Sequence, residues 1–203
     1  MSALHGEHIL LIGSGNRGKQ KEWRELLSGL DVVLVVPQDL DPAPPEPEEE
    51  GATFAENAAH KARAYAVATG LRTVADDSGL EVDALQGAPG LRSRRYFGDD
   101  ATPAERNAKL LELLRDVGAR GARFVCVAAL ATPDGRVELF EGEVRGAIGH
   151  APRGEQGFGY DPVFVIAGDG RTMAELDADE KHAISHRGLA AAKLRARLAT
   201  SGA

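Results

Sequence analysis

Near its start, the chain carries a strand pattern that runs through a glycine-rich turn directly into a helix pattern. Residues 8–12 are mostly apolar and predict a buried strand, residues 13–18 read GSGNRG, and residues 19–27 have helical periodicity. A helix that follows such a turn presents backbone N–H groups and the positive end of its dipole. Asn16 and Lys19 add side-chain donors. We therefore expect this segment to bind a phosphate group or the edge of a base.

On its residues alone, the turn admits three narrower interpretations. Residues 13–18 match the dinucleotide fingerprint G-x-G-x-x-G, but Val36, at the end of the next strand pattern, is followed by Pro37 and not by the acid that would hold a ribose. Residues 13–19 match the start of a P-loop, which requires Ser or Thr where this chain has Gln20. The third interpretation is a tight turn whose glycines serve no ligand.

The remainder of the chain alternates strand and helix patterns. Helices are predicted from Thr53 to Gly70 and from Thr102 to about Val117, because each begins with a Thr cap followed three residues later by Glu. An acidic, proline-rich loop precedes the first of them. The other predicted elements are strands over 31–36, 73–75 (with a possible continuation over 80–85), 122–132, 136–148 and 163–166, turns over 87–90 and 133–135, and a helical region over 173–198 that is interrupted near Ser185. This order predicts a single α/β domain over residues 1–203, with a mixed sheet that contains one hairpin.

The composition restricts the classes of function. The chain of 203 residues has 31 Asp and Glu against 24 Lys and Arg, a formal net charge of -7, which disfavours non-specific nucleic-acid binding. Its one cysteine, Cys126, lies in an apolar run and is interpreted as a core residue. Neither a Cys-rich nor a His-rich zinc site is expected. We find no export signal and no apolar stretch near the ~20 residues that span a bilayer, so we expect a cytoplasmic protein without a membrane partner.

Two acidic segments are candidate catalytic or metal-binding groups. Asp76 and Asp77 are expected at the end of a strand before a turn, with their side chains on opposite faces. One carboxylate is expected to bind a metal or activate water and the other to accept structural hydrogen bonds; a plain Asx turn is the alternative. Residues 48–50 are three glutamates just before a predicted helix, either a solvated loop or the source of a second metal ligand. Magnesium would need few protein carboxylates, because it keeps waters and substrate phosphates as ligands.

One predicted helix carries further candidate groups. Asn57 and Lys61 are four residues apart and share a helix face, and from that face Lys61 is placed to reach a phosphate. Glu56 is interpreted as a capping residue in preference to a catalytic residue.

The C-terminal third supplies aromatic residues and donors. Phe158 lies between Gly157 and Gly159, and Tyr160 follows Gly159. Such flanking glycines are typical of backbone that approaches a flat ligand, and Phe158 is expected to stack on a base. His186 and Arg187 are N–H donors suited to base oxygens. Ser185 before them is interpreted as a helix cap.

Six blocks of the sequence resemble those of the inosine triphosphate pyrophosphatase family, which hydrolyses noncanonical purine nucleoside triphosphates. Each block alone is weak, but six in family order over nearly the whole chain are very specific. The blocks are residues 14–19 (SGNRGK), 51–61 (GATFAENAAHK), 75–80 (ADDSGL), 87–90 (GAPG), 157–164 (GFGYDPVF) and 180–187 (EKHAISHR).

The resemblance implies an elongated, mixed-sheet α/β fold with a substrate cleft between two lobes, usually as a homodimer. It also implies magnesium-dependent hydrolysis of ITP, dITP and XTP to the monophosphate and pyrophosphate, which removes damaged purines from the nucleotide pool. Asp77 would be the catalytic base and, with Glu49, a metal ligand; Glu48 and Glu50 are alternatives to Glu49. The implied substrate-binding residues are Ser14, Gly15, Asn16, Arg17, Gly18, Lys19, Lys61, Ser78, Phe158, Gly159, Tyr160, Asp161, Lys181, His186 and Arg187.

The chain departs from the family pattern at two positions. Ser14 stands where the family often has Thr, and this replacement keeps the side-chain hydroxyl. Arg94 takes a position before Arg95 and Tyr96 where a small residue is typical, so the packing of this segment is open.

Overall fold

The computed structural model describes residues 8–200, which fall into two compact units. The first unit comprises the chain up to Asp77, the segment Val127–Glu141 and the chain from Ala190. The second comprises Ser78–Cys126 and Gly142–Leu189. The single domain, elongated shape and cleft that the sequence predicts stay predictions.

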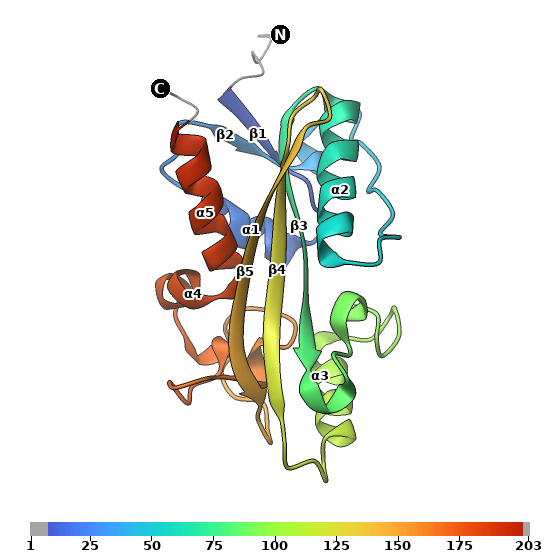
Figure 1. The fold of residues 1–203 in the computed structure, drawn as a ribbon, viewed down its shortest axis with the longest axis vertical. Coiled ribbons are helices and arrows are strands. Elements are labelled where there is room, and N and C mark those ends of the chain that lie inside the picture. Colours follow the sequence, from blue (N-terminus) through green and yellow to red (C-terminus); the bar gives the residue numbers. More distant parts are fainter. Residues whose placement is uncertain (1–7, 201–203) are drawn as a thin grey trace. The chain divides into compact units, whose positions relative to one another are not determined.

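Within residues 8–200, six strands form one hydrogen-bonded sheet in the order β2-β1-β3-β4-β5-β6. Figure 1 labels β1 to β5. In β1, Leu10 pairs in parallel with Leu34 of β2 on one side and with Arg72 of β3 on the other, whereas β5 and β6 are antiparallel. The predicted mixed sheet is therefore confirmed. The strands are β1 (Ile9–Ile12), β2 (Val33–Val35), β3 (Arg72–Val82), β4 (Gly121–Ala131), β5 (Val137–Ile148) and β6 (Phe164–Ile166).

The described part of the chain contains five α-helices, and their starts follow local capping chemistry. The helices are α1 (Arg17–Leu26), α2 (Phe54–Thr69), α3 (Pro103–Leu113), α4 (Ala178–Ile184) and α5 (His186–Thr200). Thr53 Oγ1 accepts the Glu56 N–H at the start of α2, and Thr102 and Glu105 form a complete capping box at the start of α3. These contacts satisfy amide groups that a helix end otherwise leaves without partners, so the two predicted helix starts are confirmed.

The first unit is held together by close packing of small side chains between α2 and the sheet. Ala58, Ala62 and Ala66 recur every four residues, so they form one stripe along α2. This stripe packs on Ala75, Val127, Ala129 and Ala131. Because alanines fill little space, the helix backbone lies close to the strands, and polar side chains on the same helix are brought within reach of β3.

The second unit has a larger and more aromatic core. Phe124 of β4 packs against Phe164 of β6 with ring centroids 4.5 Å apart. Leu80 and Val82 of β3 and Leu110 of α3 are fully buried in the same cluster. This core supports the loop at residues 157–161, because Tyr160 belongs to it.

The structure corrects the predicted position of the two adjacent aspartates. They were expected at a strand end before a turn, but β3 continues without a break from Arg72 to Val82. The strand is internal to the sheet, with β1 and β4 as neighbours, and its residues from Thr73 to Asp77 are all buried. The place of β3 inside the sheet and the burial of both aspartates override the turn tendency of an Asp-Asp-Ser-Gly sequence.

Smaller differences concern element lengths. Strand β2 is shorter than predicted, α3 ends at Leu113 ahead of Val117, and the expected loop after β2 begins with a 3-10 turn at Pro37–Asp39. Cys126 is fully buried, as predicted, and Arg94 is exposed, so its size creates no packing conflict.

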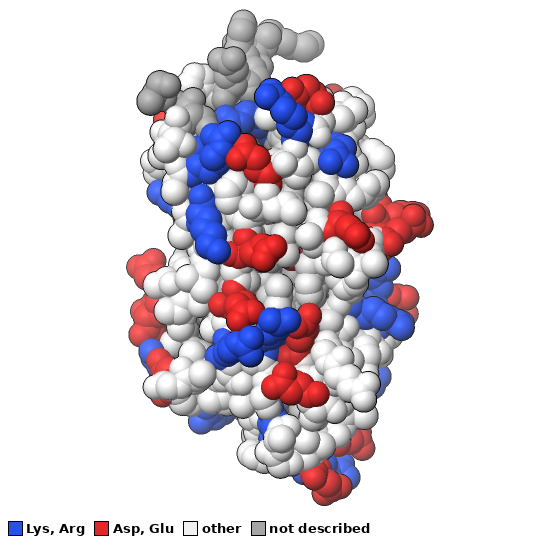
Figure 2. All heavy atoms as spheres, viewed as in Figure 1, with Lys and Arg blue, Asp and Glu red and all other residues white. Residues whose placement is uncertain are grey.

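Two surface properties bear on the expected partners. On the face drawn in Figure 2, Lys and Arg side chains are interspersed with Asp and Glu, so the described residues in this view form no broad basic patch. Within residues 8–200, no helix combines the length and the apolar character needed to cross a membrane.

Candidate functional site

The glycine turn after β1 is fixed by hydrogen bonds of its own backbone. The Gly13 N–H donates to Val74 O at 2.7 Å, and the buried Ser14 hydroxyl accepts the Asn16 N–H at 3.2 Å. A side chain at Gly13 would clash, because its Cβ would lie 2.7 Å from the Tyr65 ring. Asn16 then caps α1 by accepting the Lys19 N–H at 3.1 Å. The turn therefore aims the helix N-terminus from a rigid strand end, as an anion site requires.

The residues that would decide between the narrower interpretations of this turn have structural partners. Gln20, at the P-loop hydroxyl position, donates to Ser14 O and to Gln38 Oε1. Asp39, the late acid after the second strand, accepts the Val36 N–H at 3.0 Å and pairs with Arg24 at 3.0 Å. Both residues are explained by the local fold.

Asp76 and Asp77 occupy opposite sides of β3, as the alternation of a strand predicts. Asp76 is fully buried, accepts the Trp23 Nε1–H at 2.8 Å and pairs with Lys19 Nζ at 3.1 Å, both from α1. Asp77 Oδ2 accepts from Asn57 Nδ2 of α2 at 2.9 Å. The strand thus gives each carboxylate to a different helix, which matches the expectation of two separate roles.

Burial sets the protonation behaviour of Asp77. The pKa of its carboxyl is raised above the ordinary value near 3.8, chiefly because burial disfavours the charged form. The charges of Lys19 and Lys61 and the hydrogen bond from Asn57 oppose this shift, and the charge of Glu49 adds to it. A raised pKa moves a carboxylate toward the range in which a general base works well.

Glu49 and Lys61 form an ion pair beside Asp77. Lys61 is almost fully buried on α2, whereas the Glu49 side chain, from the acidic loop, is 29% exposed. Burial lowers the pKa of Lys61, but the charge and hydrogen bond of Glu49, together with Asp76 and Asp77, outweigh it, so the pKa is raised. Lys61 is therefore a buried cation surrounded by carboxylates.

The donor chemistry of this region fits a magnesium ion. Glu49 and Asp77 are both carboxylates, the oxygen donors that magnesium prefers, and the charge of Glu49 helps to raise the pKa of Asp77. Within residues 8–200, no group of three or more His, Cys, Asp or Glu side chains has the geometry of a metal cluster. Two carboxylates are enough for magnesium where substrate phosphates complete its shell.

The second unit gathers another set of predicted site residues around Phe158. Lys181 Nζ lies 5.3 Å and the Arg187 guanidinium 5.6 Å from the centre of the Phe158 ring. Lys181 also pairs with Asp161 at 2.7 Å, and both side chains are buried. Arg187 donates to Ser78 Oγ at 2.7 Å. An aromatic ring next to two cations suits a flat, electron-rich ligand.

The loop that carries Phe158 is shaped by its glycines and by Tyr160. Gly157 has a φ of 73°, and a Cβ there would lie 2.1 Å from Asp161 Oδ2. The Tyr160 hydroxyl donates to Ser93 O at 2.9 Å, and burial raises the pKa of Tyr160 to about 12. The close approach at Gly157 is thus to Asp161 of the protein itself, and Tyr160 anchors the loop.

His186 and Ser185 lie at the start of α5. His186 is buried and stacks on Phe124, with ring centroids 4.8 Å apart and an interplanar angle of 14°. Ser185 Oγ accepts the Gly188 N–H at 3.0 Å, which confirms the predicted helix cap. The cap fixes the first turn of α5, where His186 and Arg187 are the first two residues.

The structure brings the predicted residues together in two groups, one in each unit. In the first unit these are Ser14, Gly15, Asn16, Arg17, Gly18, Lys19, Glu49, Lys61 and Asp77, and in the second Ser78, Phe158, Gly159, Tyr160, Asp161, Lys181, His186 and Arg187. Arg17 is exposed on the first turn of α1. The role of each residue toward a ligand stays a prediction.

Two residues of the site region, Trp23 and Glu46, were missed in the sequence. Trp23 carries no motif, although its spacing of four from Lys19 places both on one face of α1. Glu46, inside an acidic run that predicted only a loop, accepts the Gly15 N–H at 3.2 Å. Glu56 was predicted as a capping residue, and its carboxylate accepts the Ala52 N–H at 2.7 Å, one residue before the cap.

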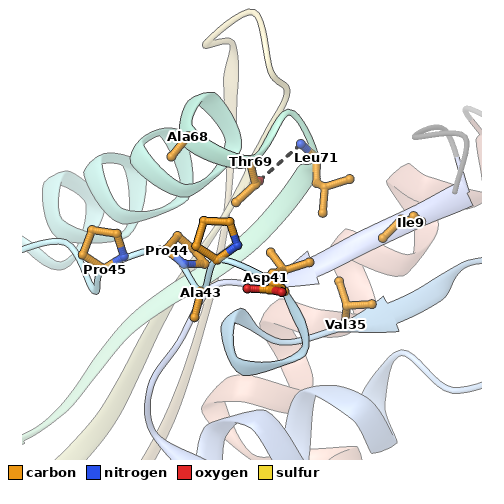
Figure 3. A pocket seen from close by; sticks show the side chains of 11 residues that line it. Ile9, Val35, Asp41, Ala43, Pro44, Pro45, Ala68, Thr69 and Leu71 are labelled. Carbon is orange, nitrogen blue, oxygen red and sulfur yellow. Dashed lines mark hydrogen bonds between the residues drawn. The ribbon is translucent and has the colours of Figure 1, made fainter. Parts of the chain in front are cut away.

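A separate pocket in the first unit is a poor place for a triphosphate. It has a volume of about 680 Å³ and is lined by the end of α2, by β1 and β2, and by the proline-rich segment (Figure 3). Most of its lining is apolar, and Asp41 is the one charged residue among the described residues that line it. A negative charge in apolar surroundings repels phosphate, so the polar groups described above remain the candidate site.

The fold and these groups define an α/β protein in which a helix N-terminus, a buried lysine and buried carboxylates gather in the first unit. A family model described as the Ham1 family matches residues 10–197, and the chain belongs to this family. The resemblance predicted from the sequence is thereby confirmed.

Individual relatives agree with this membership. The chain is 51% identical over 193 residues to a dITP/XTP pyrophosphatase of Deinococcus deserti. The matched region covers 95% of this chain and 90% of the relative. It is 47% identical over 195 residues to a dITP/XTP pyrophosphatase of Geobacter sulfurreducens, with 95% and 98% coverage. The solved structure of a HAM1 protein from Coxiella burnetii superposes with a TM-score of 0.85 at 44% identity and covers 95% of this chain and 98% of that one.

Proposed function

We propose that this protein is a magnesium-dependent nucleoside-triphosphate pyrophosphatase that converts ITP, dITP and XTP to the monophosphate and pyrophosphate. The names of the relatives support the reaction and the substrate class. The observation that carries the proposal is Asp77, a buried carboxylate with a raised pKa, held by Asn57 and close to Lys19 and Lys61. Its biological role would be to remove damaged purines from the nucleotide pool.

In this proposal Asp77 orients a water molecule and accepts its proton as the water oxygen attacks the α-phosphorus. The bond between the α-phosphorus and the α–β bridging oxygen breaks, and pyrophosphate leaves with the electron pair. Asn57 holds Asp77 from α2, so the carboxylate does not have to reorganise during the reaction. A magnesium ion held by Glu49 and Asp77 would neutralise charge on the phosphate oxygens.

The lysines supply fixed positive charge for the triphosphate. Lys19 sits at the N-terminal turn of α1, where the helix dipole also favours negative charge. Lys61 is buried and its raised pKa keeps it protonated at neutral pH. Charges held in a poorly solvated site stabilise a developing negative charge more than they would in water.

The second unit's group around Phe158 suits the purine base. The Phe158 ring offers a stacking surface, and Lys181, His186 and Arg187 offer N–H donors. A donor directed at position 6 pairs with the oxygen of hypoxanthine or xanthine, whereas adenine presents an amino group there. An unpaired buried polar group costs about 1–3 kcal/mol, so each such donor would disfavour ATP by roughly 5–150-fold.

The deciding assay incubates the protein with magnesium and ITP, dITP, XTP, GTP or ATP and follows pyrophosphate and orthophosphate separately. Pyrophosphate release from the first three, with little from GTP and ATP and none from Asp77→Asn, is the expected result. Orthophosphate as the direct product would place the attack on the γ-phosphorus and contradict the mechanism. Binding without turnover would make the protein a nucleotide-binding module. The cytoplasmic location and the homodimer stay predictions.

A further inference from the structure

One buried carboxylate connects the only tryptophan of the chain to the glycine turn. Asp76 Oδ1 accepts the Trp23 Nε1–H at 2.8 Å, and Asp76 Oδ2 lies 3.1 Å from Lys19 Nζ. Lys19 Nζ also donates to the backbone oxygen of Asp76 at 3.2 Å. Asp76 and Trp23 are both fully buried, and the Lys19 side chain is 13% exposed. The three residues therefore form a chain of contacts that leads from the core of the first unit to the glycine turn.

The geometry of α1 makes this arrangement specific. Lys19 and Trp23 are one helical turn apart, so both side chains leave the same face of α1 and meet the same residue of β3. A buried indole N–H needs an acceptor, and a buried carboxylate needs donors; each satisfies the other here. The indole ring is rigid and enclosed, so the Asp76 carboxylate is held in one orientation.

We propose that Trp23 is a positioning residue for the reaction: through Asp76, it holds the Lys19 ammonium at the place where the glycine turn receives a phosphate. The inference rests on the proposed function in one respect, namely that Lys19 contacts the triphosphate. A lysine ammonium has three N–H donors, and two of them are directed at Asp76. The third is the one for a ligand, and its direction is set once the other two are fixed.

The kinetic test uses Trp23→Phe, which removes the N–H donor and keeps an aromatic ring in the core. Asp76 then loses the partner that orients it, and Lys19 loses its fixed position. We expect the KM for dITP to rise roughly tenfold, about the value of one charge-assisted hydrogen bond, with kcat changed much less. In a Lys19→Met background, where no ammonium remains to be positioned, Trp23→Phe should change KM by less than about twofold.

A purely structural role for Trp23 predicts a different result. Loss of packing would act independently of Lys19, so the effects of Trp23→Phe and Lys19→Met on KM would multiply. Leu27→Val is the matched control, because Leu27 is a buried apolar residue just after α1 and carries no polar group. A control variant with the same loss of melting temperature should keep the wild-type KM. The proposal would be overturned if the effects of Trp23→Phe and Lys19→Met on KM multiply. An equal rise of KM in the control would also overturn it.

A second measurement does not require turnover. Because the chain has one Trp, its indole emission comes from Trp23 alone. Pyrophosphate bound at Lys19 places negative charge next to the Lys19–Asp76–Trp23 contacts, so we expect a saturable change in emission that Lys19→Met abolishes. If the wild-type protein hydrolyses none of the triphosphates, the proposed function fails while this titration still decides the link. An emission that stays constant at saturating pyrophosphate contradicts the proposal.

Discussion

The two groups of polar residues are built on different kinds of support. In the first unit, Lys19, Lys61 and Asp77 lie on α1, α2 and β3, and the Glu49 partner of Lys61 comes from a loop and is partly exposed. In the second unit, Lys181 and Asp161 pair with almost no exposure of either side chain, and the pair lies against the glycine-rich loop that carries Phe158. The difference teaches that the ion pair of the first group is open to solvent at Glu49, as exchange with the proposed ligand would require, whereas the Lys181–Asp161 pair is enclosed and holds a loop in shape.

The largest expected effect follows from removing the central carboxylate of the first group. Asp77→Asn should lower kcat by about 10²–10⁴-fold, because it removes the proposed general base while an amide oxygen can still accept from Asn57. The measurement is pyrophosphate release from dITP under saturating magnesium. Residual activity above about a tenth of the wild-type value would show that a group other than Asp77 acts as the general base.

The same variant should also be more stable than the wild type at neutral pH. The folded-state pKa of Asp77 is raised, so the folded protein binds this proton more readily than the unfolded chain does. The stability contributed by this group is therefore lost as the pH rises from the ordinary Asp value toward the raised one. Without magnesium, Asp77→Asn should melt at a higher temperature than the wild type at pH values above the raised pKa of Asp77. This difference in melting temperature should shrink as the pH falls below the ordinary Asp value.

The next effect tests whether the pair in the second unit is a structural clamp. Lys181→Met leaves Asp161 as a buried charge that has lost its ammonium partner, so we expect a loss of about 3–5 kcal/mol in the free energy of unfolding. The double variant Lys181→Met with Asp161→Asn should lose less than the sum of the two single variants, because no isolated charge remains. Urea titrations of all four proteins measure this. If the loss in the double variant equals the sum of the losses in the two single variants, the pair does not act as a unit.

A smaller effect is expected when the loop partner of the first group is changed. Glu49→Gln removes a proposed magnesium ligand and the main charge partner of the partly open ion pair with Lys61. The magnesium concentration for half-maximal rate should rise roughly tenfold or more, because magnesium relies on few protein carboxylates. Glu48→Gln and Glu50→Gln are the matched controls, since they remove the same charge from the adjacent positions. A larger shift in either control would reassign the ligand.

The smallest expected effect concerns Glu46, which accepts the Gly15 N–H in the glycine turn. A carboxylate there competes with a phosphate for the same backbone donor. Glu46→Gln should lower the KM for dITP by about twofold, and the difference should shrink as added salt screens the exposed charge. An unchanged KM at low salt would show that Gly15 is not a phosphate contact.

The parts of the fold that the sequence predicted correctly depend on neighbouring residues. The Thr53 and Thr102 caps, the Ser185 cap and the opposite directions of Asp76 and Asp77 all follow from bonds or periodicities within a few residues. The glycine turn before α1 is of the same kind. Such features are visible in a sequence because the partner groups lie close along the chain.

Tertiary structure alone decided which buried groups meet. Trp23 and Asp76 are 53 positions apart, and Tyr160 and Ser93 are 67 apart, so no local pattern joins them. The continuity of β3 through two aspartates depends on the place of the strand inside the sheet and on burial, against the turn tendency of its sequence. By itself the sequence therefore determined where helices start, which residues share a face and which family the chain resembles. The partners of its buried charges were settled by packing, because only the folded chain removes water from those groups and obliges each to find a counterpart.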